Sequence, residues 1–112
     1  MPTTLNANLF PLGLISPVPG TPVGIYGNFP DLADDPYTNL ILFQAHPDNV
    51  GRIYIGSPSM NVALNVGVNW VLITPGDGLG LDSAAGNVWD GTKFRIDAEL
   101  AGDGVFVSVH IR

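Results

Sequence analysis

The side chains that could do chemistry in this chain are few and widely spaced. Ten Asp and Glu residues and two histidines, His46 and His110, are the main candidates for acid–base work or metal binding. The histidines stand in no His-x-x-x-His or Glu-x-x-His spacing, and cysteine is absent, so we expect no zinc site. We expect His46 in a turn, and His110 on a strand with its side chain solvated or at an interface.

One short segment, Gly78-x-Gly80-x-Asp82, is similar to the calcium-binding nonapeptide of parallel β-helices. In those proteins stacked copies of the motif complete the ligand cage. Because a single copy is present, we interpret the segment as a glycine-rich turn and expect no bound metal. The sequence also contains no Gly-x-Ser-x-Gly elbow, phosphate-binding loop or dinucleotide fingerprint. We therefore expect no catalytic residues and no cofactor, and interpret the protein as non-enzymatic.

The overall charge narrows the choice of partners. The 112 residues include four Lys and Arg against ten Asp and Glu, a formal net charge of −6. Neutralising a phosphate backbone needs clustered basic side chains, so we expect no nucleic-acid partner. No apolar run approaches the ~18 residues of a membrane-spanning helix, and the first residues lack the charged and apolar regions of an export signal. We expect neither a membrane contact nor secretion.

Composition and periodicity predict an all-β fold. Charged residues are only 12% of the chain, while 14 Gly and 10 Pro supply many turns. From residue 37 on, short apolar segments separated by turn signals indicate strands, and no stretch of ten or more residues has a convincing helical period. We expect one antiparallel β-sandwich or flattened barrel of about seven to nine strands, covering residues 37–112.

The segment KFRIDAELAGDGVFVSVHIR, from Lys93 to Arg112, predicts a hairpin with its turn at Gly102 and Asp103. In this register every second side chain shares one apolar face, as an antiparallel pair requires. The members of that face are Phe94, Ile96, Ala98, Leu100, Val105, Val107, Val109 and Ile111. The opposite face, which includes Asp97, would be solvated or would touch a partner.

Residues 1–36 form a Pro-rich N-terminal segment that differs from the rest, because Pro interrupts an apolar stretch at positions 11, 17, 19, 22, 30 and 36. Proline lacks the N–H that a central strand donates, so the segment can form only edge strands or extended chain. Two interpretations stay open: the first strands of the domain's own sandwich, or an extended arm across a neighbouring subunit. As an arm it would bind its partner through Leu5, Leu9, Phe10, Leu12, Leu14 and Ile15.

The aromatic residues raise a binding alternative. Trp89, Tyr54 and Tyr37 would make a sugar-stacking platform if they lay in a row on one exposed sheet face. We expect Trp70, which precedes the apolar VLIT, in the core, and Trp89 partly exposed beside the Asp90–Gly91 turn. A carbohydrate-binding β-sandwich is therefore the rival from another functional class.

Residues 38–112 contain a series of short sequence segments that recur together in other proteins: ILFQAHPDNVG, RIYIGSPSMN, ITPGDGLGLD, VWDGTKFRID and GDGVFVSVHIR. This arrangement resembles a pattern found in small β-sandwich virion structural proteins of tailed bacteriophages. In such proteins the Pro-Gly precedes a strand, and a strand with the GDGV pattern terminates the chain. The resemblance implies head decoration, or another accessory role in the shell or tail.

From the resemblance we expect a capsid decoration (cement) protein that binds between subunits of the major capsid protein and stabilises the head. It would be made in the host cytoplasm and located in the virion. A homo-oligomer is expected, with a trimer the first guess, because capsid lattices present three-fold positions. The alternatives are a tail, baseplate or head–tail connector component, and the carbohydrate-binding module.

Overall fold

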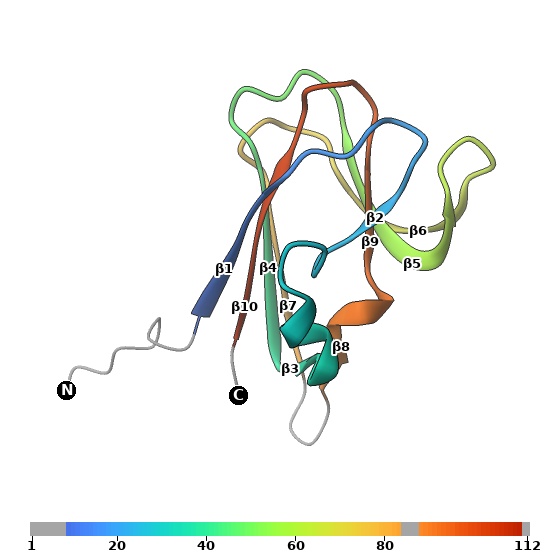
Figure 1. Ribbon diagram of the computed structural model, residues 1–112. Helices are drawn as coiled ribbons and strands as arrows, with labels where there is room; N and C mark the ends of the chain where they lie inside the picture. The colour runs from blue at the N-terminus through green and yellow to red at the C-terminus, as the bar shows by residue number, and fades with distance from the viewer. Residues whose placement is uncertain (1–8, 84–87, 111–112) are drawn as a thin grey trace.

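The computed structural model describes residues 9–83 and 88–110, which form two packed four-stranded sheets and a small two-stranded one (Figure 1). Every strand pair in these residues is antiparallel. The all-β sandwich predicted from the sequence is therefore confirmed. We call the two larger sheets sheet A and sheet B.

Sheet A has the strand order β1–β10–β4–β7. Its members are β1 (Leu9–Ile15), β10 (Val105–His110), β4 (Leu40–Ala45) and β7 (Gly78–Asp82). Strand β10 lies in the interior, between β1 and β4, while β1 and β7 form the two edges.

Strand β7 corrects one sequence interpretation. The Gly78-x-Gly80-x-Asp82 segment, expected to be a glycine-rich turn, pairs with β4 over its whole length. Two leucines alternate with the glycines: Leu81 is buried in the core and Leu79 packs against it. The core contacts of these leucines hold the segment extended, although glycine itself weakens a strand.

Sheet B has the strand order β2–β9–β5–β6. Its members are β2 (Val23–Gly24), β9 (Arg95–Ala98), β5 (Ile53–Asn61) and β6 (Val66–Leu72). The β5–β6 hairpin changes register on either side of Gly56 and projects to one side of the molecule (Figure 1). Gly56 lies against the carbonyl of Gly67, which has a φ of 71°, and a side chain at either position would collide with the facing strand. These glycines therefore permit the irregular crossing of the two strands.

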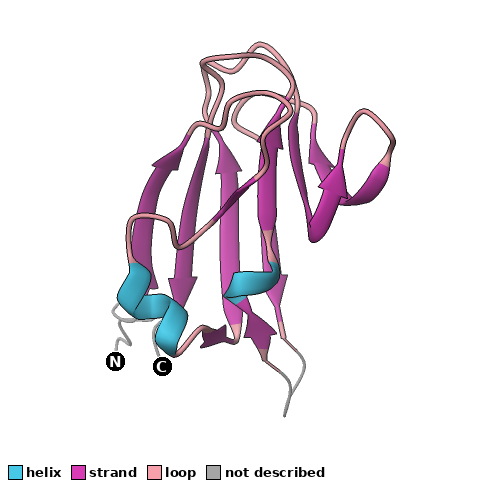
Figure 2. Ribbon diagram, turned by 45° about the vertical axis from the view of Figure 1, so that its right-hand side comes forward, coloured by secondary structure: helices cyan, strands magenta, loops and turns pink. Residues whose placement is uncertain are grey.

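The two ends of the sandwich differ (Figure 2). One end carries the two-stranded sheet, β3 (Tyr37–Thr38) with β8 (Trp89–Asp90), and the 3-10 helices η2 (Pro30–Asp34) and η3 (Gly91–Lys93). The other end carries the loops that join β1 to β2, β4 to β5, β6 to β7 and β9 to β10. Neither helix of the described residues could cross a membrane.

One hydrophobic core fills the space between the facing sides of the sheets. In β4, Ile41, Phe43 and Ala45 are buried, while the residues between them are not. In β10, Val105, Val107 and Val109 are buried in the same alternating way. This period of two is the pattern of strands with one side on a core.

The strand pairing near the end of the chain differs from the predicted hairpin. Strand β9 pairs with β5 and β2 in sheet B, whereas β10 pairs with β1 and β4 in sheet A. The loop of residues 99–104 between them crosses from one sheet to the other. Alternation specifies which side chains share a face and leaves the partner strand open, so the predicted pairing of these two strands is wrong.

The predicted apolar face is confirmed for most of its residues, because Phe94, Ile96, Ala98, Val105, Val107 and Val109 are all buried. Leu100 is the exception and is 43% exposed, because it belongs to the crossing loop. Ile111 lies outside the described residues.

The predicted solvated face is wrong for Asp97, which is only 1% exposed. Its side chain lies on the outer side of sheet B, as the alternation of β9 requires. The β1–β2 loop lies over it, and the Gly20 N–H donates a hydrogen bond to its Oδ1 at 3.1 Å. A loop distant in sequence thus buries a position that the local pattern assigns to solvent.

Candidate interaction surface

The predicted contact residues from Leu9 to Ile15 lie on β1, which the structure places in the chain's own sheet A. Phe10 pairs with Val109 of β10, and Ile15 pairs with Val105. The register shifts between Pro11 and Gly13, where Gly13 has a φ of 87°. This irregularity accommodates proline in a sheet, which an edge strand tolerates and a central strand does not. For Leu9–Ile15 the structure shows an edge strand of the chain's own sheet.

The predicted contact side chains of β1 divide between the core and the surface. Leu12 is buried in the core, and Ile15 packs against it. Phe10 packs edge-to-face with Phe29, with ring centroids 5.1 Å apart. Leu14 is the exposed member, at 46%.

Two of the predicted residues cannot be placed as contacts. Leu5 lies outside the described residues, and of Leu9 only the backbone pairing with His110 is described.

An apolar groove follows the open side of the sandwich, between the edge strands β1 and β2. Its volume is about 310 Å³. The apolar residues that line it are Leu12, Leu14, Ile15, Pro17, Val18, Val23 and Ile25. Within the described residues β1 pairs only with β10, so its other edge is free beside this groove. A free strand edge next to apolar side chains is the geometry that accepts an added strand.

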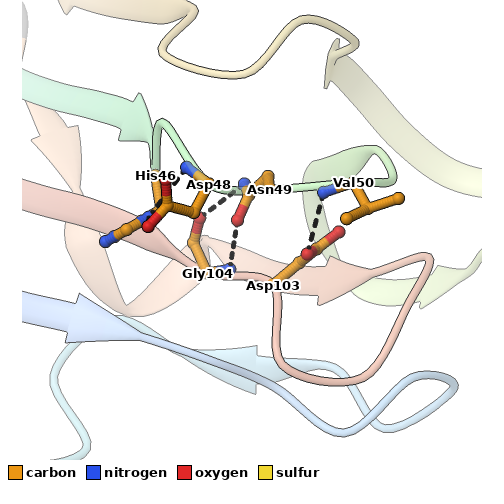
Figure 3. A network of polar contacts seen from close by, with 6 residues as sticks. All are labelled: His46, Asp48, Asn49, Val50, Asp103 and Gly104. Atoms are coloured by element: carbon orange, nitrogen blue, oxygen red, sulfur yellow. Dashed lines mark hydrogen bonds and ion pairs between the residues drawn. The ribbon is translucent and has the colours of Figure 1, made fainter.

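The end of the sandwich next to this groove is fixed by a buried polar network (Figure 3). The carboxylate of Asp103 accepts hydrogen bonds from the N–H groups of Val50, at 3.0 Å, and Gly51, at 2.6 Å. The Asn49 side chain donates to the Gly104 carbonyl and accepts from the Gly104 N–H, both at 2.8 Å. Asn49 and Asp103 are 6% and 5% exposed. The network therefore joins the β4–β5 loop to the β9–β10 loop in a nearly dry environment, where such bonds hold a fixed geometry.

The β1–β2 loop is attached to the same network. The Ser16 hydroxyl donates to the Asp103 carbonyl oxygen at 2.7 Å. His46, in the loop position expected from the sequence, stacks on Phe106 of β10, with ring centroids 5.4 Å apart. The loop that borders the groove is thus attached to the buried network through Ser16.

At the opposite end of the sandwich, Tyr26 connects β2 to the small sheet. Its hydroxyl donates to the Pro36 carbonyl at 3.2 Å. Burial raises the pKa of the Tyr26 phenol above its ordinary value of 10.0, and the nearby carboxylates of Asp90 and Asp35 raise it further. Each cause disfavours the charged phenolate. Tyr26 is therefore a neutral structural donor.

The tryptophans form a second candidate surface beside β8. Trp70 and Trp89 are both half-buried and pack on Phe94, with ring centroids 6.3 Å and 5.8 Å from its ring. They border a hollow of about 280 Å³ together with Asp90 and Lys93. The row of Trp89, Tyr54 and Tyr37 that a sugar-stacking platform would need is not formed at this hollow, because neither tyrosine lines it.

Among the sequence-predicted metal and acid–base candidates, His46 Nδ1 lies 4.0 Å from a carboxylate oxygen of Asp48. Within the described residues no three His, Cys, Asp or Glu side chains are grouped as metal ligands would be. Asp82 is exposed on β7, and His110 lies half-buried on β10 with its Nδ1 buried and without a hydrogen-bond partner in the described part of the chain.

Sequence reasoning missed the two carboxylates that the fold uses most. Asp103 followed a glycine at an apparent turn, and Asp97 alternated with apolar residues as a surface residue would. Both are buried by loops that approach from distant parts of the chain, a signal that local sequence does not carry.

Comparison with known proteins gives no relative for this fold or surface: no family model, curated protein or solved structure matches the chain.

Proposed function

We propose that this protein is a non-enzymatic structural protein of a bacteriophage virion. It acts as a capsid decoration protein that attaches between major capsid protein subunits through the β1 edge and the apolar groove. The observation that supports this most is the groove of about 310 Å³ beside a free strand edge. The sequence resemblance supplies the identity of the partner and the expectation of a homo-oligomer, with a trimer first.

The chemistry of the groove suits a protein partner. Leu14 and Val18 are 46% and 69% exposed, so burying them against a partner would supply roughly half to two-thirds of the ~1.5–3 kcal/mol that full burial of such a side chain contributes. A strand added along β1 would supply backbone hydrogen bonds beside these apolar anchors. The loops fixed by Asp103 and Ser16 reduce the ordering that binding would require.

The proposal is tested with purified particles of the phage that encodes the chain. Quantitative mass spectrometry should find the protein in fixed ratio to the major capsid protein, and labelling should place it on the head. Labelling on the tail or baseplate would support the alternative position, and absence from particles would contradict a virion role.

A pair of variants tests the surface itself. Leu14→Asp should keep the folded β-structure by circular dichroism and lose attachment to particles stripped of the protein. The control Val66→Asp changes a side chain of similar exposure, 48%, on β6, at an edge of sheet B. It should fold and attach normally. Equal attachment of both variants would exclude the β1 groove.

The hollow beside Trp70 and Trp89 favours a second candidate function, carbohydrate binding. The half-buried tryptophans offer aromatic rings on which a sugar could stack, and Asp90 and Lys93 offer polar groups for hydrogen bonds. Titration of the isolated protein with glycans, followed by Trp fluorescence, would support this function if binding is saturable and is lost in Trp89→Ala.

A further inference from the structure

A pocket of about 350 Å³ opens on the outer side of sheet B, apart from the β1 groove. Three parts of the chain enclose it. The floor contains Tyr54 of β5 with Asp97 and Glu99, one wall is Gly20 and Pro22 of the β1–β2 loop, and the other is the end of the β5–β6 hairpin at residues 60–63. Tyr54 and Asp97 are direct cross-strand neighbours in the β5–β9 register. The pocket volume lies within the range of small-ligand sites, about 300–1,000 Å³.

Asp97 makes this pocket more than an exposed acidic cluster. The residue is 1% exposed, yet it lines the pocket. The N–H groups of Gly20 and Ala98 both donate to its Oδ1, at 3.1 Å and 2.8 Å. Within the described residues Oδ2 accepts no hydrogen bond. This oxygen is open to the pocket, where a cationic donor could make a charge-assisted hydrogen bond to it.

The other polar residues of the floor point to the same kind of ligand. Glu99 accepts the Arg52 N–H on Oε1 at 3.1 Å, which leaves Oε2 available. Among the described residues that line the pocket none is basic, so the two carboxylates have no cation there. Tyr54 adds an aromatic ring, and aromatic faces attract cations, guanidinium most often. A planar guanidinium with several donors suits two carboxylates and a ring better than a compact ammonium does.

We propose that the pocket of Tyr54, Asp97 and Glu99 binds a guanidinium group. The source is an arginine side chain of a protein or a free guanidino compound. This inference does not rest on the proposed capsid role, because it concerns a different face of the molecule.

The test follows the Gly20 and Ala98 amide signals by ¹H–¹⁵N NMR, since both amides bind the Asp97 carboxylate. The probes are the tripeptide Gly-Arg-Gly and free agmatine, with Gly-citrulline-Gly as the neutral control of the same shape. Saturable shifts with the peptide and agmatine, and none with citrulline, are expected. The tighter of the two binders identifies the source. Equal shifts with citrulline, or no shifts with any probe, would overturn the proposal.

Two variants that each remove one negative charge test whether guanidinium binding depends on this pocket. Asp97→Asn keeps an oxygen acceptor for the Gly20 and Ala98 N–H groups, so the variant should fold. It replaces Oδ2, which faces the pocket, by an amide donor. The affinity for the guanidinium probes should therefore fall roughly tenfold or more. Asp82→Asn, on exposed β7, should bind as the wild type does. If both variants lose the same affinity, the attraction is that of the net charge and the pocket is not a specific site. Where Asp97→Asn fails to fold, Glu99→Gln gives the same comparison from the exposed side of the pocket.

Discussion

Asp103 shows how one side chain can hold two distant loops. Its carboxylate accepts two backbone N–H groups of the β4–β5 loop, and its own carbonyl accepts the Ser16 hydroxyl. Backbone donors that are shielded from water need acceptors, and the strand pairing of the described residues provides none for Val50 and Gly51. The carboxylate therefore takes the place of a missing strand partner for Val50 and Gly51.

Replacing this carboxylate should destabilise the whole domain. Asp103→Ala leaves the Val50 and Gly51 N–H groups without an acceptor and should lower the free energy of unfolding by about 1–3 kcal/mol in urea denaturation. The control Asp48→Ala removes an exposed carboxylate whose contact is His46 Nδ1 at 4.0 Å, and should have little effect. Equal urea midpoints for the two variants would contradict the role assigned to Asp103.

Tyr26 predicts a pH dependence whose sign follows from its raised pKa. The folded state favours the neutral phenol, so the stability it contributes is complete below a pH of about 10 and is lost as the pH rises through the folded-state pKa. Tyr26→Phe cannot ionise and should be less stable than the wild type at pH 7, because it lacks the hydrogen bond to Pro36. Urea midpoints measured at pH 7, 9 and 11 should show this difference shrinking at the highest pH. A constant difference would mean that the pKa of Tyr26 is unchanged on folding, which would contradict its raised value in the folded state.

At the scale of elements, strands β9 and β10 show which features of the fold the sequence could predict and which it could not. Alternation identified Ile96, Ala98 and the valines of β10 as core residues. It could not identify their partner strands, because antiparallel neighbours in a hairpin and facing strands in a sandwich bury the same pattern. The Gly-Asp pair was a sound turn signal, but its loop connects two sheets. The remaining misses, β7 and the buried Asp97, depend on core contacts and loops from elsewhere in the chain.

The absence of cysteine makes this pairing directly testable by engineered disulfides. Gln44 and Phe106 are paired across β4 and β10, and directly opposed residues have the Cα spacing that a disulfide needs. Gln44→Cys with Phe106→Cys should therefore oxidise to an intramolecular bridge. Glu99→Cys with Phe106→Cys, the pair that the hairpin register would bring together, should remain reduced under the same conditions. The reverse result on non-reducing gels would restore the hairpin.

At the scale of the whole molecule, one loop belongs to both proposed sites. Pro17 and Val18 of the β1–β2 loop line the groove, and Gly20 and Pro22 of the same loop line the acidic pocket. Ser16 fixes one end of the loop to Asp103, and Gly20 fixes its middle to Asp97. A partner strand along β1 would therefore contact the segment that closes the pocket, and the two sites share a wall.

The position of β10 also affects the order in which the chain can fold during synthesis. Strand β10, which leaves the ribosome after all the other described strands, lies between β1 and β4 in sheet A. Until it emerges, β1 lacks its partner, and β4 can pair only with β7. Strand β1 must therefore wait until β10 has been synthesised, and its apolar side chains lack this partner strand during that interval. Sheet B has all four of its strands once β9 has emerged, so it can form first and act as the template on which sheet A closes.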